Sequence, residues 1–529
     1  MALSLSVPVS TSALPREIET NPKKARTWIE SLPLTKTFEA ANMVAQTIKT
    51  LNHGKMPGDE RAALVDIYRP VVAVLLDELE AIYAYSVLPL PPRQREAFDL
   101  ARELSIQCAT TYKIVLMEKS SKLSMFNNKK NLPGAVYWAM FYLQSQLLQS
   151  YKTYHPCPVG VWQDLHALSL HAGEQGMLAD IGDPGSKTTV HDLYIDALMV
   201  ALADPYRLMF KEVDKVQDTL TQNRGLVDIR TSNEGLSQQR FFVVALDGDQ
   251  PPKVLNQGVP PPTGQILRLI DPTRLVEKLQ QRVRAQGGAG GMGSSAAAKS
   301  RATHDLADLQ QRLIRLWGDP PKRQFRRNPA DSAIALCGGI KAIAYFTELA
   351  TTEDPEADAK AIRDGDTIPL LKIPRDEMSQ MIGVEPWHVL NQSANGLRLY
   401  RESGGKVGVT VGEVVGLRFV GGRSWNVGVV RWLTSLEGEA MEFGVELLAP
   451  AAVSITIEPT IGGGGKPMPA LVLQNPNPEW DNDTVLSLTD TFSDLREFEL
   501  IEHDEITLVR ATTLLEHTSR FDLFQFQKS

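Results

Sequence analysis

The spacing of the apolar residues changes along this chain of 529 residues, and the change constrains the fold more than any single motif does. From about Lys36 to about Val216 the apolar residues recur every three or four positions, which is typical of amphipathic helices. Beyond Gly225 they alternate with polar residues or form short β-branched runs, which favour strands. The chain is also too long for one hydrophobic core, so we expect a multidomain α+β protein.

The helical spacing predicts an N-terminal α-helical array over residues 36–224. Its connections are short, so neighbouring helices should be antiparallel. The expected helices lie near residues 36–52, 60–84, 92–118, 132–154, 159–174 and 188–203. The opening MALSLSVPVSTSALP lacks the basic flank of a signal peptide, and we expect residues 1–35 to form a loose tail.

Turn and linker residues divide the second half of the chain. Strand-like and helix-like runs predict a small mixed α/β module, and the segment GGAGGMGSSAAAKS predicts a flexible linker because it has nothing to pack. Strand-rich sequence follows a short connecting helix, and its last part could complete a barrel, extend it or form a second one. The expected parts are the module at 225–286, the linker at 287–303, the helix at 304–320, a β-barrel region at 321–460 with an insertion at about 341–386, and a β-rich extension at 461–529.

Charge and cysteine usage exclude several classes of function. The formal net charge is −8, which argues against general nucleic-acid binding, since phosphate binding relies on clustered Lys and Arg. Cys108, Cys157 and Cys337 are scattered without a C-x-x-C pair, so we expect neither a disulfide framework nor a metal site. We also expect no cofactor, no membrane span and a reducing, cytoplasmic environment.

Two short motifs stand in the strand-rich region. Arg323 and Arg327 form R-x-x-x-R directly after a Pro-Pro pair, and Asn391, Ser393 and Gly396 fit [D/N]-x-S-x-x-G. The segments GLRLY, EVVGLRFV, NVGVVRWL and MEFGVELL then suit strands of a small antiparallel barrel. Together these features resemble the signature of the PilZ family over roughly a quarter of the chain, whereas the helical half is not assigned to a family.

The resemblance implies a receptor for cyclic di-GMP, whose two guanines present O6 and N7 acceptors beside two phosphates. A guanidinium fork matches that guanine edge, and it can also stack on a base. The resemblance implies that Arg323 and Arg327 clamp guanine and phosphate, with Arg326 able to replace a neighbour. It also implies the roles of the second motif: Asn391 and Ser393 hydrogen-bond a guanine, and Gly396 permits a tight turn with close backbone approach.

The motifs depart from the family in their separation, because Asn391 lies 64 positions after Arg327 (391 − 327). An insertion in the barrel follows, and it could change the ligand stoichiometry or close the site. Taken singly, each motif is also compatible with a solvated basic face or an ordinary turn.

The function expected from these features is a receptor that couples cyclic di-GMP binding to the presentation of the helical array to a protein partner. The alternative is a ligand-independent scaffold or adaptor. We do not expect an enzyme; the best candidates for acid–base chemistry are the carboxylates Glu78, Glu80 and Glu103. His155, His166 and His171 lack the spacing of a metal pair on one helical face and are interpreted as core or surface residues.

Overall fold

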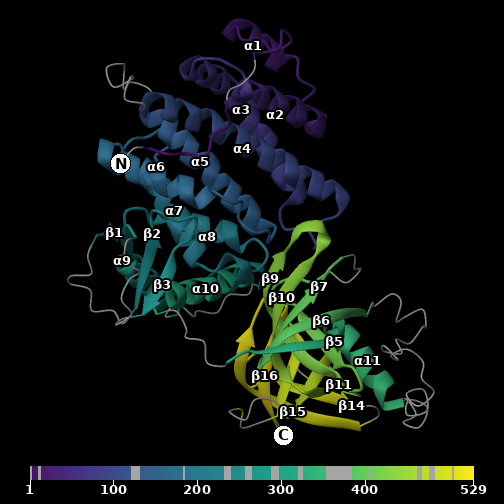
Figure 1. Ribbon diagram of the computed structural model, residues 1–529. Helices are drawn as coiled ribbons and strands as arrows, with labels where there is room; N and C mark the ends of the chain where they lie inside the picture. Colours follow the sequence, from purple (N-terminus) through teal and green to yellow (C-terminus); the bar gives the residue numbers. More distant parts are fainter. Residues whose placement is uncertain are drawn as a thin grey trace. The chain divides into compact units, whose positions relative to one another are not determined.

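The computed structural model contains two compact units, which are described separately: residues 1–86 with 90–321, and residues 322–529 with 87–89 (Figure 1). The residues that it describes are 3–9, 13–120, 132–182, 185–231, 240–256, 265–287, 297–319, 326–352, 384–403, 408–422, 424–460, 467–475, 480, 483–502 and 505–529. The middle of the predicted linker, at 288–296, lies outside them, as does most of the predicted insertion, at 353–383.

The first unit begins with the predicted α-helical array. The six predicted helices are confirmed to within a few residues as α2 to α7, whereas α1 and α8 were not predicted. Long amphipathic runs with Pro, Gly or Asn between them account for these boundaries. In chain order the elements are α1 (Pro22–Glu30), α2 (Thr37–His53), α3 (Gly58–Tyr83), α4 (Pro92–Ser120), α5 (Leu132–Lys152), α6 (Val161–Gln175), α7 (Val190–Leu202), the 3-10 turn η3 (Pro205–Arg207) and α8 (Glu212–Gln222).

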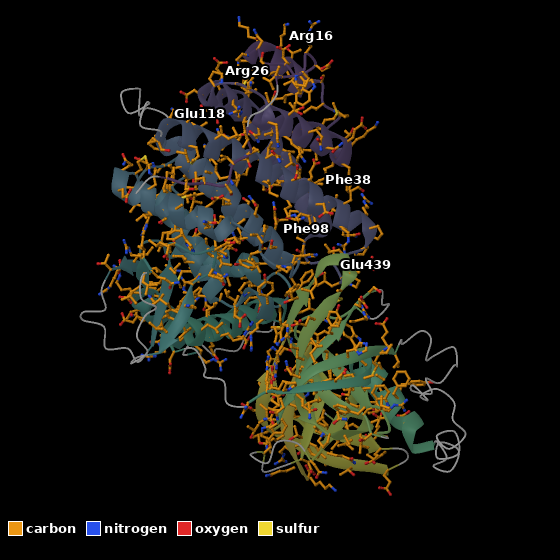
Figure 2. The ribbon with its side chains drawn as sticks, viewed as in Figure 1. Arg16, Arg26, Phe38, Phe98, Glu118 and Glu439 are labelled. Atoms are coloured by element: carbon orange, nitrogen blue, oxygen red, sulfur yellow. The ribbon has the colours of Figure 1, made fainter. Side chains whose placement is uncertain are left out.

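Aromatic side chains fill the interior of the array. Phe98 lies on α4 (Figure 2). Its ring meets Tyr83 edge-on at 5.6 Å and lies 4.8 Å from the imidazole of His155, centroid to centroid. Burial lowers the pKa of His155 to about 4. This imidazole is therefore a neutral part of the core at pH 7.

The N-terminal residues are anchored, so the expectation of a loose tail is wrong for the described part of residues 1–35. Leu5 is buried, and Ser6 donates to the carboxylate of Asp164 through its amide (3.1 Å) and its hydroxyl (2.6 Å). Lys113 donates to the same carboxylate at 2.8 Å. The segment thus contributes hydrogen bonds to a buried ion pair, which hydropathy patterns do not reveal.

A four-stranded sheet with two helices follows the array and belongs to the same unit. The strand order is β1-β4-β2-β3, and the indole of Trp317 in the last helix donates to the carbonyl of Met199 at 3.2 Å. The elements are β1 (Asp228–Arg230), β2 (Arg240–Ala245), β3 (Lys253–Asn256), β4 (Leu267–Asp271), α9 (Thr273–Gly287) and α10 (Ala297–Gly318). Since α10 begins at Ala297, residues 297–303 are helical and the expectation of a linker there is wrong.

The hairpin between β2 and β3 caps helix α6. Asp249 accepts hydrogen bonds from the backbone N–H groups of Gly160 (2.7 Å) and Gln163 (3.1 Å), at the end of the helix where such groups lack intrahelical partners. This carboxylate fixes the sheet module against the array.

We expect Asp249→Ala to lower the local stability of α6 by about 1 kcal/mol, the usual cost of losing a capping side chain. Amide hydrogen exchange in α6 measures the effect. Asp247→Ala, at an exposed position of the same hairpin, is the matched control and should leave exchange in α6 unchanged. Equal exchange in the two variants would contradict the capping role.

The second unit contains two closed antiparallel barrels. The first has the order β10-β7-β6-β5-β8-β9, and its interior holds Trp387 and Phe443 edge-on at 4.7 Å. Its strands confirm the predicted antiparallel barrel, and closure leaves no open sheet edge. They are β5 (Asn328–Gly338), β6 (Glu385–Ser393), β7 (Gly396–Arg401), β8 (Val414–Phe419), β9 (Asn426–Ser435) and β10 (Met441–Ala449), with the 3-10 turn η4 (Glu437–Glu439) before β10.

The remaining strands form a second barrel with the order β11-β12-β13-β16-β15-β14, the third of the outcomes left open by the sequence. The predicted boundary at residue 460 is wrong, because β11 starts directly after Pro450 and already belongs to this barrel. The strands are β11 (Ala451–Pro459), β12 (Met468–Gln474), β13 (Thr484–Leu488), β14 (Glu497–Glu502), β15 (Glu505–His517) and β16 (Phe521–Lys528).

Helix α11 (Ile340–Thr352), the described part of the predicted insertion, packs between the two barrels. One hydrophobic cluster contains Ile343 and Phe346 of α11, Trp425 and Val427 of the first barrel, and residues of the second barrel such as Leu471. The ring of Phe346 stacks on Trp425 at 5.2 Å. The two barrels therefore share a core.

Among the helices that the structure describes, none is both long and apolar enough to cross a membrane.

Candidate functional site

The two motifs meet on the first barrel although 64 positions separate them. Arg326 and Arg327 are exposed and lead directly into β5, which pairs antiparallel with β6. In that pairing Asn328 lies opposite Gln392 and Pro329 opposite Asn391. Arg327 directly precedes Asn328, and Ser393 directly follows Gln392. Strand pairing, rather than proximity in sequence, brings the arginine segment to the second motif. Arg323 lies outside the described residues.

The second motif forms the hairpin between β6 and β7. Ser393 pairs with Gly396 across this hairpin, and its hydroxyl donates a long hydrogen bond to the Gly396 carbonyl (3.4 Å). A Cβ at Gly396 would lie 3.1 Å from the carbonyl oxygen of Val445 on β10. The close approach of β10, rather than a left-handed backbone, favours glycine at this position.

Strand register extends this site into a line of residues across the outer face of the barrel. Trp432 pairs with Gly444, Gly444 with Arg398, Arg398 with Asn391, and Asn391 with Pro329. We call these five residues the outer row. A Cβ at Gly444 would overlap the indole of Trp432, so the glycine allows this half-buried ring to lie flat across β10.

Irregular pairing surrounds the outer row. The register shifts between Pro329 and Ser332 in β5, at Leu390 in β6 and at Arg431 in β9. Such bulges occur at barrel rims and beside binding sites, because the extra residue redirects the neighbouring side chains. Their concentration here distinguishes this face of the barrel from a regular strand surface.

Carboxylates fix Arg398 and Arg401 in this barrel. Arg398 donates to both oxygens of Glu442, through Nε at 2.7 Å and Nη2 at 2.8 Å, and these hydrogen bonds raise the pKa of Arg398. Inside the barrel Arg401 pairs with Glu385 and lies over the ring of Trp387 at 4.4 Å. Burial lowers the pKa of Arg401, while Glu385 opposes that change. Arg398 therefore presents a fixed planar cation beside Asn391, whereas Arg401 stabilises the core.

Arg398 and Trp432 were missed as site residues by sequence reasoning. Their segments were identified as strands, and the alternation of side chains puts Arg398 on the same face as Gly396. Their pairing partners, however, follow from the register and the bulges, which sequence alone does not specify.

The other candidate residues are engaged in structural contacts. Glu78 accepts from the hydroxyl of Thr37 (2.7 Å), Glu80 pairs with Lys152, and Glu103 accepts from Lys49 (3.0 Å). His166 hydrogen-bonds the Tyr194 hydroxyl (2.8 Å) and the Gln250 carbonyl (2.9 Å). Among the described residues no group of three His, Cys, Asp or Glu side chains could hold a metal ion.

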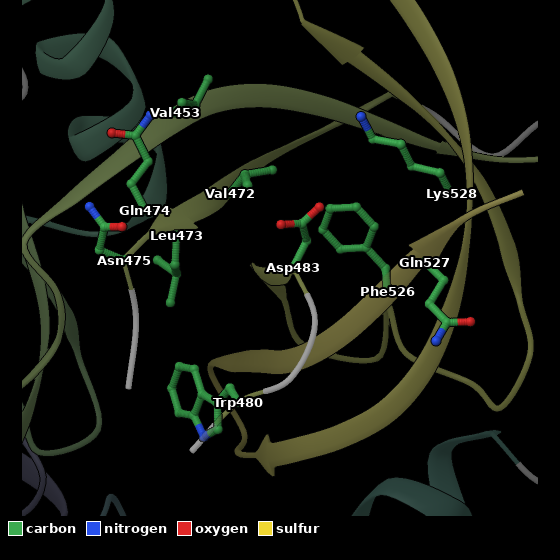
Figure 3. A pocket seen from close by; sticks show the side chains of 10 residues that line it. All are labelled: Val453, Val472, Leu473, Gln474, Asn475, Trp480, Asp483, Phe526, Gln527 and Lys528. Carbon is green, nitrogen blue, oxygen red and sulfur yellow. The ribbon is translucent and has the colours of Figure 1, made fainter. Parts of the chain in front are cut away.

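A cavity of about 920 Å³ lies in the second barrel rather than at the motifs (Figure 3). Val453, Val472 and Phe526 line it together with the charged side chains of Asp483 and Lys528. None of the described residues of either motif contributes to its lining. This cavity is thus separate from the site that the strand register assembles.

Comparison with known proteins gives matches over most of the chain. A family described as "Cyclic-di-GMP receptor FimW, N-terminal domain" matches residues 23–233, and one described as "Cyclic-di-GMP receptor FimW, middle PilZ domain" matches residues 241–353 and 375–453. The chain is similar to the "Cyclic-di-GMP receptor FimW" of Pseudomonas aeruginosa, with 25% identity over 505 aligned residues that cover 85% of this chain and 81% of that protein. No solved structure matches.

Proposed function

We propose that this chain, whose C-terminal part belongs to the PilZ family, is a receptor that binds cyclic di-GMP on the outer face of its first barrel. The observation that carries the proposal is the pairing of β5 with β6, in which Asn328, the residue after Arg327, lies opposite Gln392 of the second motif. A chance occurrence of two short motifs would not require them to be neighbours in space. The similarity to a protein described as a cyclic-di-GMP receptor supports the same ligand.

The chemistry of the site suits the two guanines and two phosphates of this ligand. In the proposed mode Arg323 and Arg327 hold a guanine edge and a phosphate through their planar forks, and Arg326 can replace either. Asn391 and Ser393 hydrogen-bond a guanine. Gly396 keeps the hairpin close to β10, so that the ligand can approach the backbone.

The outer row adds two side chains, Arg398 and Trp432, to the proposed binding mode. Arg398, held flat by Glu442, offers further donors beside Asn391. Trp432 offers an aromatic plane at the other end of the row, and stacking on such planes is a common way to bind bases.

As an effector, the protein would respond to the ligand through the segment that joins its two units. Arg323 and Arg327 lie just beyond the division between the units at residues 321 and 322. Ordering this segment against the barrel changes how the helical array is presented to a protein partner. We expect the radius of gyration, measured by small-angle X-ray scattering, to change when cyclic di-GMP binds; superimposable profiles at saturation would contradict the switch.

In this proposal the protein is a cytoplasmic receptor without catalytic activity. The pairing of Glu78, Glu80 and Glu103 with separate partners supports that interpretation. A ligand-independent scaffold remains the second candidate, because the closed barrel and the array could both serve as docking surfaces.

Calorimetric titration of the full chain with cyclic di-GMP tests the proposal. We expect saturable binding by the wild type that GTP does not displace, and about five- to tenfold weaker binding by Ser393→Ala, since one hydrogen bond contributes about 1 kcal/mol. Ser454→Ala, on a strand of the second barrel, is the matched control and should bind as the wild type does. Absence of binding by folded wild-type protein would favour the scaffold.

A further inference from the structure

The residue before Trp432 has an unusual place in its strand. In the pairing of β9 with β10 the register passes from Val430 opposite Val445 to Trp432 opposite Gly444, so the backbone of Arg431 is not paired with any residue of β10. It is therefore the extra residue of a β-bulge, which redirects side chains on both sides of it. The bulge allows Trp432 to lie across Gly444 while Arg431 reaches the second barrel.

Three short hydrogen bonds hold Arg431. Its Nη1 and Nη2 donate to the two carboxylate oxygens of Glu516 in β15 at 2.5 and 2.7 Å, and its Nε donates to Glu446 in β10 at 2.6 Å. Burial alone would lower the pKa of Arg431, but the bonds to Glu516 and Glu446 raise it. A planar guanidinium held by two carboxylates is fixed in orientation as well as in position.

The second barrel determines where Glu516 lies. The pairing of β15 with β16 passes from Leu514 opposite Phe524 to Glu516 opposite Leu523, so Leu515 is itself a bulge residue. Leu515 packs against the hydrophobic cluster that contains α11 and residues of both barrels. The carboxylate that holds Arg431 is thus anchored in the shared core.

Both partners of Arg431 connect to the candidate site. Glu446 pairs in the barrel with Gly396 of the second motif, and Arg431 is bonded along the chain to Trp432 of the outer row. Glu516 itself belongs to neither motif, and the matched family domains end at residue 453, before β15.

We propose that Glu516 of the second barrel is a positioning residue for the cyclic di-GMP site, because it holds the Arg431 bulge that sets Trp432 at the end of the outer row. This inference rests on the proposed function. It makes the second barrel part of the receptor site, acting through Arg431 without touching the ligand. Removing the charge of Glu516 leaves Arg431 held by Glu446 alone and lets Trp432 leave its place over Gly444.

The test measures cyclic di-GMP affinity of the full chain for Glu516→Gln, which keeps the size of the side chain and removes its charge. We expect binding to weaken by at least about fivefold, within the range of coupling between contacting residues. Glu413→Gln is the matched control. It breaks another ion pair between the barrels, Arg520 to Glu413 at 2.6 Å, and should bind as the wild type does.

A second substitution separates positioning from mere stability. In a Trp432→Ala background, Glu516→Gln should cause little further loss of affinity, because its effect passes through the missing ring. If Glu516→Gln does not fold, Glu516→Asp serves in its place, since it keeps the charge but has a shorter side chain.

Two results would overturn the inference and leave the proposed function standing. One is that the wild type binds cyclic di-GMP and Glu516→Gln binds it with the same affinity; the other is that the two substitutions cause additive losses of affinity in the double variant. Absence of wild-type binding would overturn both the inference and the proposed function.

Discussion

Replacing Arg327 by alanine should weaken cyclic di-GMP binding by about 10- to 100-fold, because hydrogen bonds to charged groups contribute about 1.5–3 kcal/mol. Arg327 directly precedes β5, whose first residue Asn328 lies opposite Gln392, so its guanidinium can reach a ligand held by the second motif. Calorimetric titration of the full chain gives the affinity. Arg327→Lys should fall between the wild type and the alanine variant, since it keeps the charge but loses the planar fork.

Two further variants make this result specific. Arg510→Ala is the matched control, because Arg510 is an exposed arginine of the second barrel that pairs with Glu497 at 2.6 Å. It should bind within twofold of the wild type. If Arg326 replaces its neighbour, the double variant Arg326→Ala and Arg327→Ala should lose the binding that Arg327→Ala retains. Wild-type affinity in that double variant would contradict the arginine segment as part of the site.

Replacing Phe346 by alanine should destabilise both barrels, by about 3–5 kcal/mol, the usual cost of truncating a large aromatic side chain in a core. Phe346 is 2% exposed and stacks on Trp425 of the first barrel, in a cluster that includes Leu471 and Phe521 of the second. Hydrogen exchange followed by mass spectrometry should show faster exchange in β8 and in β12 together.

The control for this variant is Ile506→Ala, an apolar truncation at a position that is 64% exposed on the second barrel. It should change stability by no more than about 0.5 kcal/mol. Helices of the first unit should keep their exchange rates in both variants. Faster exchange in one barrel alone after Phe346→Ala would contradict the shared core.

Local patterns predicted the helices and the first barrel well, because periodicity and turn residues act over a few positions. The expected helix at 60–84 is α3, Gly58–Tyr83, and the four strand segments quoted for the barrel are β7 to β10. The failures concern contacts between distant segments. The anchoring of Ser6 by Asp164 depends on a buried carboxylate 158 positions away, which no local pattern reveals.

The same holds for the candidate site: the sequence predicted its motif residues, but not the residues that strand pairing adds to them. Its motif residues were named from the sequence, and the pairing of Asn391 with Pro329 supports their grouping. Arg398 and Trp432 could be identified as site residues only once the strand register was known, since a shift of one residue would turn either side chain to the opposite face. The bulge at Arg431 makes that shift, so counting positions along β9 would have misplaced the indole.

The helix between the barrels also determines which fragment of the protein can be studied alone. A fragment that ends at residue 453, where the matched PilZ domain ends, would leave the apolar side of α11 without its second partner. Such newly exposed apolar surface favours association between copies in solution. A preparation that keeps residues 322–529 together retains both barrels around α11. Aggregation of a shorter fragment would therefore be caused by the truncation and would carry no information on ligand binding.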